Sequence, residues 1–277
     1  EVLARTASGS VTFDDEYYAD GKPASVHGYY SAVYIDRLNK ALRMYGGSRS
    51  KSGNPIQRIS AFNTLTGAYD AEATWSSPSP PTLVGANSAT FARHPYTEKV
   101  YCWFYNAAIS VWDPATPTTL TTLISSPSNP AAADSSAAVD PLRNQVFVFG
   151  GGAGGTMSRC YDIATNAIRT ITLTGSDISG SAGGCGMFWC AGLGKFVVTL
   201  VNASPGPAVY TITPTTGSSW VCAALSTTGG STIAETLGNG AGGASPRTKW
   251  LYSPRHGHAI FGPRWGSNVW RLKLHEV

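Results

Sequence analysis

Charged residues are scarce in this sequence. They make up 13% of its 277 residues, and only 16 of them are Asp or Glu. The formal net charge is +4, and most lysines and arginines stand singly along the chain. Proteins that bind nucleic acid usually carry a basic stripe, so we expect no nucleic-acid partner. The shortage of carboxylates also disfavours hydrolases that need two of them at one site.

Several other patterns are missing. No run of about 18 apolar residues occurs, so we expect no membrane span. No segment combines a 3.6-residue apolar period with helix caps, which argues against a helical fold. No serine lies in a GxSxG motif and no catalytic triad can be assembled, so no catalytic residue is predicted. The chain starts at Glu1 without a signal-peptide pattern, which we interpret as a processed or trimmed product.

The cysteines fit neither a disulfide framework nor a zinc site. Their number, five, is odd, and no pair has CxxC spacing. They are Cys102, Cys160, Cys185, Cys190 and Cys222. We interpret them as buried free thiols, which favours folding in a reducing compartment. The pair His256 and His258 has no carboxylate nearby in sequence, so we predict no metal and no other cofactor.

Short strands separated by polar turns fill the chain instead. Hydrophobic residues reach 42%, enough for a packed core. An aromatic residue followed by a polar turn recurs about every 50 residues, at Phe62, Trp112, Tyr161, Tyr210 and Trp270. A strand–turn–strand segment precedes each of them. Each period therefore predicts four antiparallel strands, the content of one propeller blade.

The spacing predicts an all-β fold, a five-bladed β-propeller of four-stranded antiparallel blades. We expect a single domain over residues 1–277, with blades at 28–75, 86–124, 135–173, 184–225 and 248–277. The first strand of each unit has small side chains, which suits the crowded central axis. Fourth strands are expected near Ala73–Trp75, Leu120–Ile124, Ile168–Leu173 and Trp220–Leu225. The last unit lacks a fourth strand, so we expect residues 9–13 to close that blade.

Glycine doublets end two of the predicted second strands, Gly46-Gly47 and Gly150-Gly151, and an aromatic segment leads to Trp75 in the first unit. These features resemble the kelch motif. Over nearly the whole chain the sequence is similar to the kelch and galactose-oxidase-like propeller superfamily. That resemblance implies a propeller fold, and its members include oxidases, lectin-like binders and interaction scaffolds. A fold shared by such different proteins does not by itself decide the function.

The connections between predicted strands differ in length. Those between first and second strands, and between third and fourth, are short, whereas the others are long. In an up-and-down blade the long connections share one face, where binding residues are common. The candidate ligand-binding residues on that face are Tyr29, Tyr30, Arg49, Lys51, Asn54, Tyr105, Asn106, Arg159, Asn202, Arg264, Trp265 and Asn268. Aromatic, Arg and Asn side chains together suit the recognition of sugars.

Each of these side chains can instead serve its own loop, by capping the core or bonding the loop backbone. Asp113 and Asp162 begin short turns and are interpreted as turn formers. The predicted function is a non-catalytic module that recognises a glycan or receptor, on a secreted protein or on a virion such as a phage tail or surface. A structural or decoration scaffold that docks other virion or structural proteins is the alternative. A glycan-active hydrolase or lyase ranks third. The expected location is extracellular or on a virion surface.

Overall fold

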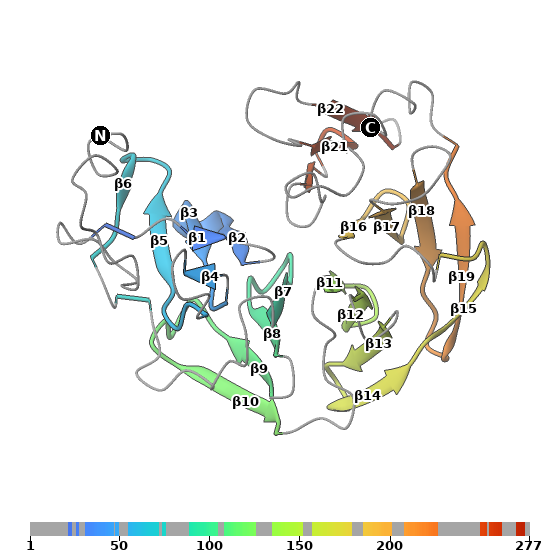
Figure 1. The fold of residues 1–277 in the computed structure, drawn as a ribbon, viewed down its shortest axis with the longest axis horizontal. Helices are drawn as coiled ribbons and strands as arrows, with labels where there is room; N and C mark the ends of the chain where they lie inside the picture. The colour runs from blue at the N-terminus through green and yellow to red at the C-terminus, as the bar shows by residue number, and fades with distance from the viewer. Residues whose placement is uncertain are drawn as a thin grey trace.

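The computed structural model of this chain is a β-propeller with five blades (Figure 1). It describes residues 22–23, 26–27, 31–46, 48–49, 55–71, 74–75, 89–104, 108–125, 135–151, 157–178, 185–200, 208–226, 250–253, 255–261 and 270–274. Blades 1 to 3 contain four antiparallel strands each, blade 4 contains five strands, and the described part of blade 5 contains three. The prediction of an all-β five-bladed propeller is confirmed. The helical structure in these ranges is a single 3-10 turn, η1 (Asp36–Leu38).

Within a blade, consecutive strands run from the centre of the disc to its rim. Blade 1 contains β2 (Ala32–Ile35), β3 (Lys40–Arg43), β5 (Ser60–Asn63) and β6 (Ala68–Tyr69). Blade 2 contains β7 (Ala89–Arg93), β8 (Val100–Phe104), β9 (Ile109–Trp112) and β10 (Leu120–Ile124). Blade 3 contains β11 (Ser135–Asp140), β12 (Gln145–Gly150), β13 (Met157–Asp162) and β14 (Ala167–Thr170). Blade 4 contains β16 (Gly186–Cys190), β17 (Lys195–Leu200), β18 (Ala208–Thr213) and β19 (Ser219–Ala224), and blade 5 contains β20 (Trp250–Ser253), β21 (His258–Phe261) and β22 (Trp270–Lys273).

In blades 1 to 4 the innermost strands begin with small residues. Figure 1 shows β2, β7, β11 and β16 nearest the centre, and β6, β10, β14 and β15 (Thr172–Gly175) at the rim. Strand β11 packs between β7 and β16, and it begins with Ser135, Ser136 and Ala137. Small side chains let neighbouring strands approach closely where the blades converge. The predicted position of the first strands at the axis is therefore confirmed.

Large apolar side chains fill the spaces between blades, which we call junctions and number by their two blades. Phe104 and Trp112 are fully buried in junction 1–2. Phe147 and Trp220 are fully buried in junction 3–4, with ring centroids 4.8 Å apart. Burying one large apolar side chain contributes roughly 1.5–3 kcal/mol, so these aromatic contacts stabilise the packing of neighbouring blades.

A residue in the left-handed conformation ends every described turn between a first and a second strand. These residues are Asn39, Glu98, Asn144, Gly194 and Gly257, with φ from 51° to 62°. Asn and Gly adopt this conformation readily, whereas other side chains are strained there. Glu98 is thus the exception among the turns of the disc. Its surroundings, described below, hold it in place.

The fourth strand of blade 1 differs from the prediction. It is β6 at Ala68–Tyr69, and Trp75 lies in a later turn. Gly67, with φ 69°, completes a tight turn directly after the third strand, so the fourth strand begins at once. The Trp75 ring packs in junction 1–2, and its Nε1 donates to Asp70 Oδ2 at 2.7 Å. The indole is therefore buried with its polar atom bonded. The predicted strand at Ala73–Trp75 is wrong, because Trp75 is buried from a turn and not from a strand.

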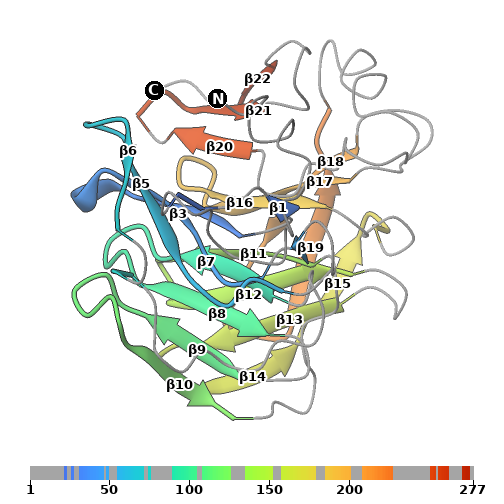
Figure 2. The ribbon, with the colours of Figure 1, turned by 60° about the vertical axis from the view of Figure 1, so that its left-hand side comes forward.

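The segment predicted as one fourth strand in blade 3, Ile168–Leu173, belongs to two sheets. Strand β14 ends at Thr170, and β15 (Thr172–Gly175) joins blade 4 as a fifth strand. It pairs in parallel with β19, and Figures 1 and 2 both show the two strands side by side at the rim. Gly175 has φ 93°, and a Cβ at this position would collide with the carbonyl oxygen of Cys222. The close approach of β15 to β19 therefore requires glycine.

The ring closure proposed for residues 9–13 lies outside the described residues and stays a prediction. The described packing joins blades 1 to 5 through four junctions, 1–2, 2–3, 3–4 and 4–5. Blade 5 contributes Tyr252, Ala259 and Leu272 to the last of them. The last blade is thus attached to the rest of the disc through blade 4, as the predicted order of blades requires.

Apart from β15, the consecutive strands of each blade alternate in direction, so the connections between them alternate between two faces of the disc. The short-turn face carries the turns at 36–39, 94–99, 141–144, 191–194, 64–67, 113–119, 163–166 and 214–218. The long-loop face carries the links from second to third strands and from one blade to the next. A site on the short-turn face would therefore be formed by tight turns, and a site on the long-loop face by longer connections.

Candidate functional site

The candidate binding residues lie in segments that the structure describes only in part. Arg49 lies in β4 (Ser48–Arg49), which pairs antiparallel with β1 (Val26–His27) so that Arg49 is opposite Val26. This pairing holds the chain before blade 1 beside the second-to-third loop of that blade. The candidates that lie outside the described residues are Tyr29, Tyr30, Lys51, Asn54, Tyr105, Asn106, Asn202, Arg264, Trp265 and Asn268.

Arg159 is a strand residue, not a loop residue as expected. It lies near the long-loop end of β13, on the same side of the strand as Met157 and Tyr161, which pack in junction 2–3. Its Nη1 donates to the carbonyl of Ser158 at 3.4 Å. Its Nε is buried and has no hydrogen-bond partner among the described residues. Arg159 therefore forms part of the blade wall just below the long-loop face.

Glycines set the direction in which two second-to-third loops leave their strands. Gly46 has φ 84°, and Gly150 and Gly151 have φ 101° and 139°. Other residues rarely adopt these angles. The Gly46 N–H donates to the Ile56 carbonyl at 2.8 Å, which closes the base of the loop in blade 1. The base of this loop is therefore fixed by the scaffold.

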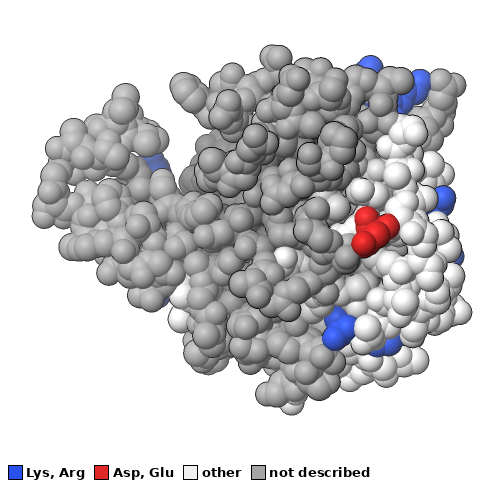
Figure 3. All heavy atoms as spheres, turned by 45° about the vertical axis from the view of Figure 1, so that its right-hand side comes forward, with Lys and Arg blue, Asp and Glu red and all other residues white. Residues whose placement is uncertain are grey.

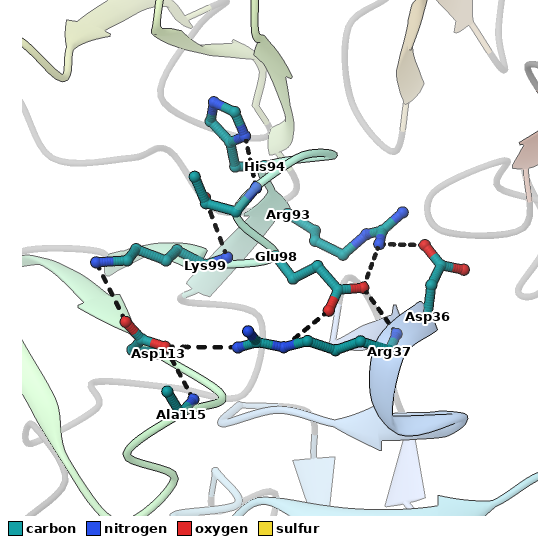
Figure 4. A network of polar contacts seen from close by, with 9 residues as sticks. Asp36, Arg37, Arg93, His94, Glu98, Lys99, Asp113 and Ala115 are labelled. Carbon is teal, nitrogen blue, oxygen red and sulfur yellow. Dashed lines mark hydrogen bonds and ion pairs between the residues drawn. The ribbon is translucent and has the colours of Figure 1, made fainter.

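The short-turn face carries a network of ion pairs that sequence reasoning did not identify (Figure 4). At its centre the Glu98 carboxylate lies between two guanidinium groups. Oε1 accepts from the Arg37 backbone N–H at 3.2 Å and from Arg93 Nη1 at 3.1 Å, and Oε2 lies 3.0 Å from Arg37 Nε. The Glu98 side chain is only 8% exposed. Because Arg37 comes from blade 1 and Glu98 from blade 2, these contacts tie two blades together.

Asp113 extends this network. Its Oδ2 lies 3.1 Å from Lys99 Nζ and its Oδ1 lies 3.7 Å from Arg37 Nη2. Its Oδ1 also accepts the Ala115 backbone N–H at 2.9 Å. This backbone hydrogen bond, helped by Lys99 and Arg37, lowers the pKa of Asp113 and outweighs the opposing effect of burial. Asp36, which bonds Arg93, completes the set.

We call this set the turn clamp; its members are Asp36, Arg37, Arg93, Glu98, Lys99 and Asp113. Its acidic and basic members are equal in number and contact one another directly. The buried Glu98 carboxylate is engaged by Arg37 through Oε2 and by Arg93 through Oε1. The arrangement therefore serves to hold Glu98 in its strained conformation and to join blades 1 and 2.

Asp113 and Asp162 act as turn formers, as predicted. The Asp162 Oδ1 accepts the backbone N–H groups of Ala164 and Thr165, each at 3.0 Å. These bonds, that of Thr165 first, lower the pKa of Asp162 against the opposing effect of burial. A carboxylate that accepts backbone N–H groups two and three residues ahead replaces the hydrogen bonds that the turn leaves open. Both aspartates are thus part of the scaffold.

All the cysteines are buried and free, which confirms their interpretation as structural thiols. Burial raises the pKa of Cys102 far above its usual range. It also raises the pKa of Cys160 to about 12 and that of Cys222 to about 11. The thiolate is the reactive form, so these groups are inert while the blades stay packed.

The histidine pair in blade 5 bonds within its own turn. His256 Nδ1 lies 2.9 Å from Ser253 Oγ, and His258 Nδ1 contacts the His256 carbonyl. Among the described residues, no group of three or more His, Cys, Asp or Glu side chains could hold a metal ion. The residues that the structure describes also include no helix long and apolar enough to cross a bilayer.

Charged side chains are sparse among the described residues on the face drawn in Figure 3. The described residues there are mostly neither acidic nor basic, with small separate patches of blue and of red. This distribution agrees with the low share of charged residues in the sequence, 13%. Binding to a nucleic-acid backbone needs a continuous basic surface, which the described part of this face does not present.

Comparison with known proteins supports the fold alone. No protein-family model and no curated protein matches the sequence. A protein of solved structure from Lactobacillus plantarum is 16% identical, with a TM-score of 0.50 over 85% of this chain and 62% of that one. TolB from Acinetobacter baumannii is 15% identical, with a TM-score of 0.47 over 83% of this chain and 49% of that one. A GH43 glycoside hydrolase is 14% identical, with a TM-score of 0.42 over 91% of this chain and 51% of that one.

The chain is a β-propeller that is distantly similar to these proteins. It spans between about half and three-fifths of their lengths. Identities this low do not carry a ligand or a reaction from one propeller to another. No family model matches the sequence, so the resemblance to the kelch motif is not shown at the level of a family. The function must therefore be argued from the residues of this chain.

The turn clamp was missed because it joins residues that are far apart in sequence. Arg37 and Glu98 are 61 residues apart. One signal was present: Glu98 occupies the turn position that holds Asn39 and Asn144 in the neighbouring blades. A glutamate at a position that favours Asn or Gly indicates that specific contacts hold it there. Comparing the turns position by position would have identified Glu98, but not its partners.

Proposed function

We propose that this chain is a non-catalytic binding module whose long-loop face recognises a glycan or a surface receptor. The observation that carries the proposal is the difference between the two faces. Side chains such as Asp113 and Asp162 cap turns of the short-turn face, and the turn clamp joins the turns of blades 1 and 2. Rigid scaffolds with long loops on one side commonly bind ligands with those loops. The fixed base of the Gly46 loop supports such a site.

The proposal of a non-catalytic role is supported by the positions of six of the seven described carboxylates. Asp70 pairs with Lys40 at 2.6 Å, and Asp140 pairs with Arg143 at 2.8 Å. Asp162 caps its turn, and the remaining acids of junction 1–2 belong to the turn clamp. A glycan-active hydrolase or lyase needs carboxylates that are free to exchange protons with substrate. The carboxylates named here are committed to the scaffold, so an enzyme ranks third.

We place the chain, within this proposal, near the kelch-like propellers. Support comes from Gly46 and from the doublet Gly150-Gly151, which all have positive φ where second strands end. We further propose a location outside the cell or on a virion surface, such as a phage tail. Free thiols suit a protein that folds in a reducing compartment and acts elsewhere.

A structural docking scaffold is the second candidate, and exposed apolar side chains favour it. Leu65 is 76% exposed, Tyr96 72% and Leu142 66%. All three lie at the tips of turns on the short-turn face. Aromatic and aliphatic residues at the centre of a protein interface contribute much of its affinity. In this case the partner would be another virion or structural protein.

A glycan-array screen of the purified chain tests the two candidates against each other. Arg49→Ala and Trp265→Ala change the long-loop face, and Tyr96→Ala changes the short-turn face as a matched control. We expect reproducible glycan signals that both long-loop variants weaken at least tenfold and that Tyr96→Ala leaves unchanged. Losing one buried aromatic or Arg contact commonly has an effect of this size.

Two results would contradict the glycan proposal. Signals unchanged in Arg49→Ala and Trp265→Ala would place binding elsewhere. No signal from any glycan, together with capture of a virion or structural protein that Tyr96→Ala abolishes, would favour the docking scaffold instead.

A further inference from the structure

A histidine caps the turn between the first two strands of blade 2. His94 Nδ1 accepts the backbone N–H groups of Tyr96 at 3.2 Å and Thr97 at 3.3 Å. On the other side of the ring, Nε2 lies 3.4 Å from Oδ1 of Asn144 in blade 3. The residue is 5% exposed. One imidazole thus closes its own turn and contacts the neighbouring blade.

The equivalent turn of blade 3 uses a carboxylate in the same place. Asp140 Oδ1 accepts the backbone N–H groups of Leu142 at 2.9 Å and Arg143 at 3.3 Å. Both turns have proline as their second residue and end in a left-handed residue, Glu98 or Asn144. In blade 1, Asn63 Oδ1 caps a turn in the same way. The chemistry of the cap therefore differs at His94 while its geometry is kept.

The contacts determine where the imidazole proton lies. Nδ1 faces two N–H donors, so it must carry a lone pair, and the neutral ring carries its proton on Nε2. This tautomer donates to Asn144 Oδ1. A second proton would have to be placed on Nδ1, where it would point at the N–H groups of Tyr96 and Thr97. Protonation is therefore incompatible with the turn cap.

The charged groups near His94 are engaged with one another. Within and beside its own turn they are Arg93, Glu98 and Lys99, and from blade 1 they are Asp36 and Arg37, all members of the turn clamp. The turn of blade 3 that contains Asn144 carries the pair Asp140 and Arg143. The ring of Tyr96 lies 5.8 Å from the imidazole. These charges balance, so none of them offsets a proton added to the ring.

We propose that His94 is an acid-sensitive switch for the contact between blades 2 and 3. In its neutral form it caps the blade 2 turn and bonds Asn144. When protonated it releases the Tyr96 and Thr97 amides, and the contact between the two turns loosens. This response concerns the short-turn face and goes beyond the proposed binding function of the long-loop face.

The electrostatics of the site support this direction. Burial lowers the pKa of His94 below its ordinary value of 6.5, and the hydrogen bond to Asn144 opposes that shift only in part. A base with a lowered pKa binds its proton more readily in the unfolded chain. The contribution of His94 to stability is therefore fully present above about pH 6.5, where the unfolded histidine is neutral. It declines as the pH falls from there through the pKa of the folded state.

The switch is tested by melting the protein between about pH 7.5 and pH 5, the range in which a histidine changes charge. The chain itself is compared with His94→Asn, which can cap the turn as Asn63 does but does not titrate. His256→Asn removes an exposed histidine of blade 5 and serves as the matched control. We expect Tm of the unchanged chain and of His256→Asn to fall by about 2–4 °C more than Tm of His94→Asn, a shift typical of losing one turn cap in a protein of this size.

The imidazole ¹⁵N chemical shifts of the unchanged chain give an independent reading that needs no variant. At neutral pH they should report the tautomer with the proton on Nε2. Parallel loss of Tm in the unchanged chain and in His94→Asn would overturn the proposal. A proton on Nδ1 at neutral pH would also overturn it. Neither result depends on what the long-loop face binds.

Discussion

Junctions 1–2 and 3–4 join neighbouring blades in different ways. Junction 1–2 adds side chains to its aromatic core, through the ion pairs of Glu98 with Arg37 and Arg93. Junction 3–4 adds a whole strand, because β15 leaves blade 3 and pairs with β19 of blade 4. Ion pairs depend on pH and salt, whereas backbone pairing depends on register and close approach. The two junctions should therefore fail under different conditions.

Replacing Gly175 should have the largest effect on stability, because this residue lies in β15 at its contact with β19. In Gly175→Ala, the added Cβ meets the Cys222 carbonyl and the residue must keep φ near 93°. We expect a loss of roughly 2–4 kcal/mol in the free energy of unfolding, from the clash and the strained backbone together. Urea denaturation followed by tryptophan fluorescence measures it.

Gly67→Ala is the matched control for that experiment. Gly67 has φ 69°, but an added Cβ there has no atom within 4 Å. It should cost only about 1 kcal/mol, for the left-handed conformation alone. Equal losses in the two variants would show that the contact between β15 and β19 does not limit stability.

Glu98→Gln should have the next largest effect, because it neutralises the centre of the turn clamp. The glutamine keeps the size of the side chain but leaves Arg37 and Arg93 without their shared buried carboxylate. We expect a loss of about 1–2 kcal/mol, because Glu98 is buried whereas Arg37 and Arg93 are 48% and 25% exposed and keep other carboxylate partners. Thermal unfolding at low and at high salt measures it. The loss should shrink at high salt, and a loss unaffected by salt would argue against ion pairing as the cause.

Asp113→Asn should have the smallest effect, because its partners Lys99 and Arg37 are 44% and 48% exposed. The asparagine can still accept the Ala115 N–H, so the loss at neutral pH should be below about 1 kcal/mol. The pKa of Asp113 is lowered in the folded state, mainly by that backbone bond. Its stabilising contribution is therefore present above about pH 4 and is lost as the pH falls further. Unfolding curves of the two proteins should converge at the acid end, and a gap that persists there would contradict the assignment.

The sequence predicted those features of the fold that repeat along the chain. The period of the aromatic residues, the small inner strands and the turn aspartates Asp113 and Asp162 each recur or follow local rules. The structure departs from prediction where a contact is not local. The parallel pairing of β15 with β19 leaves no periodic mark, because it uses residues that also fit blade 3.

The candidate site was less predictable than the fold. The positions of the loops follow from the order of the strands, and the sequence therefore predicts which connections share the long-loop face. Which side chains act together depends on loop conformation, and no turn rule specifies it. Arg159 illustrates this limit, because its position depends on where β13 begins, and that strand begins at Met157. The turn clamp illustrates it too, since Arg37 and Glu98 meet only after two blades have packed.

The buried thiols provide a way to follow how the blades of the disc separate. Cys102 lies in junction 1–2, Cys160 and Cys222 lie in junction 3–4, and Cys190 lies in junction 4–5. An alkylating reagent can reach each thiol only after the blades around it have separated. The order in which a short exposure to such a reagent marks these cysteines would therefore give the order in which neighbouring blades part. Mass spectrometry of the alkylated peptides would give that order from the natural cysteines, without engineered ones.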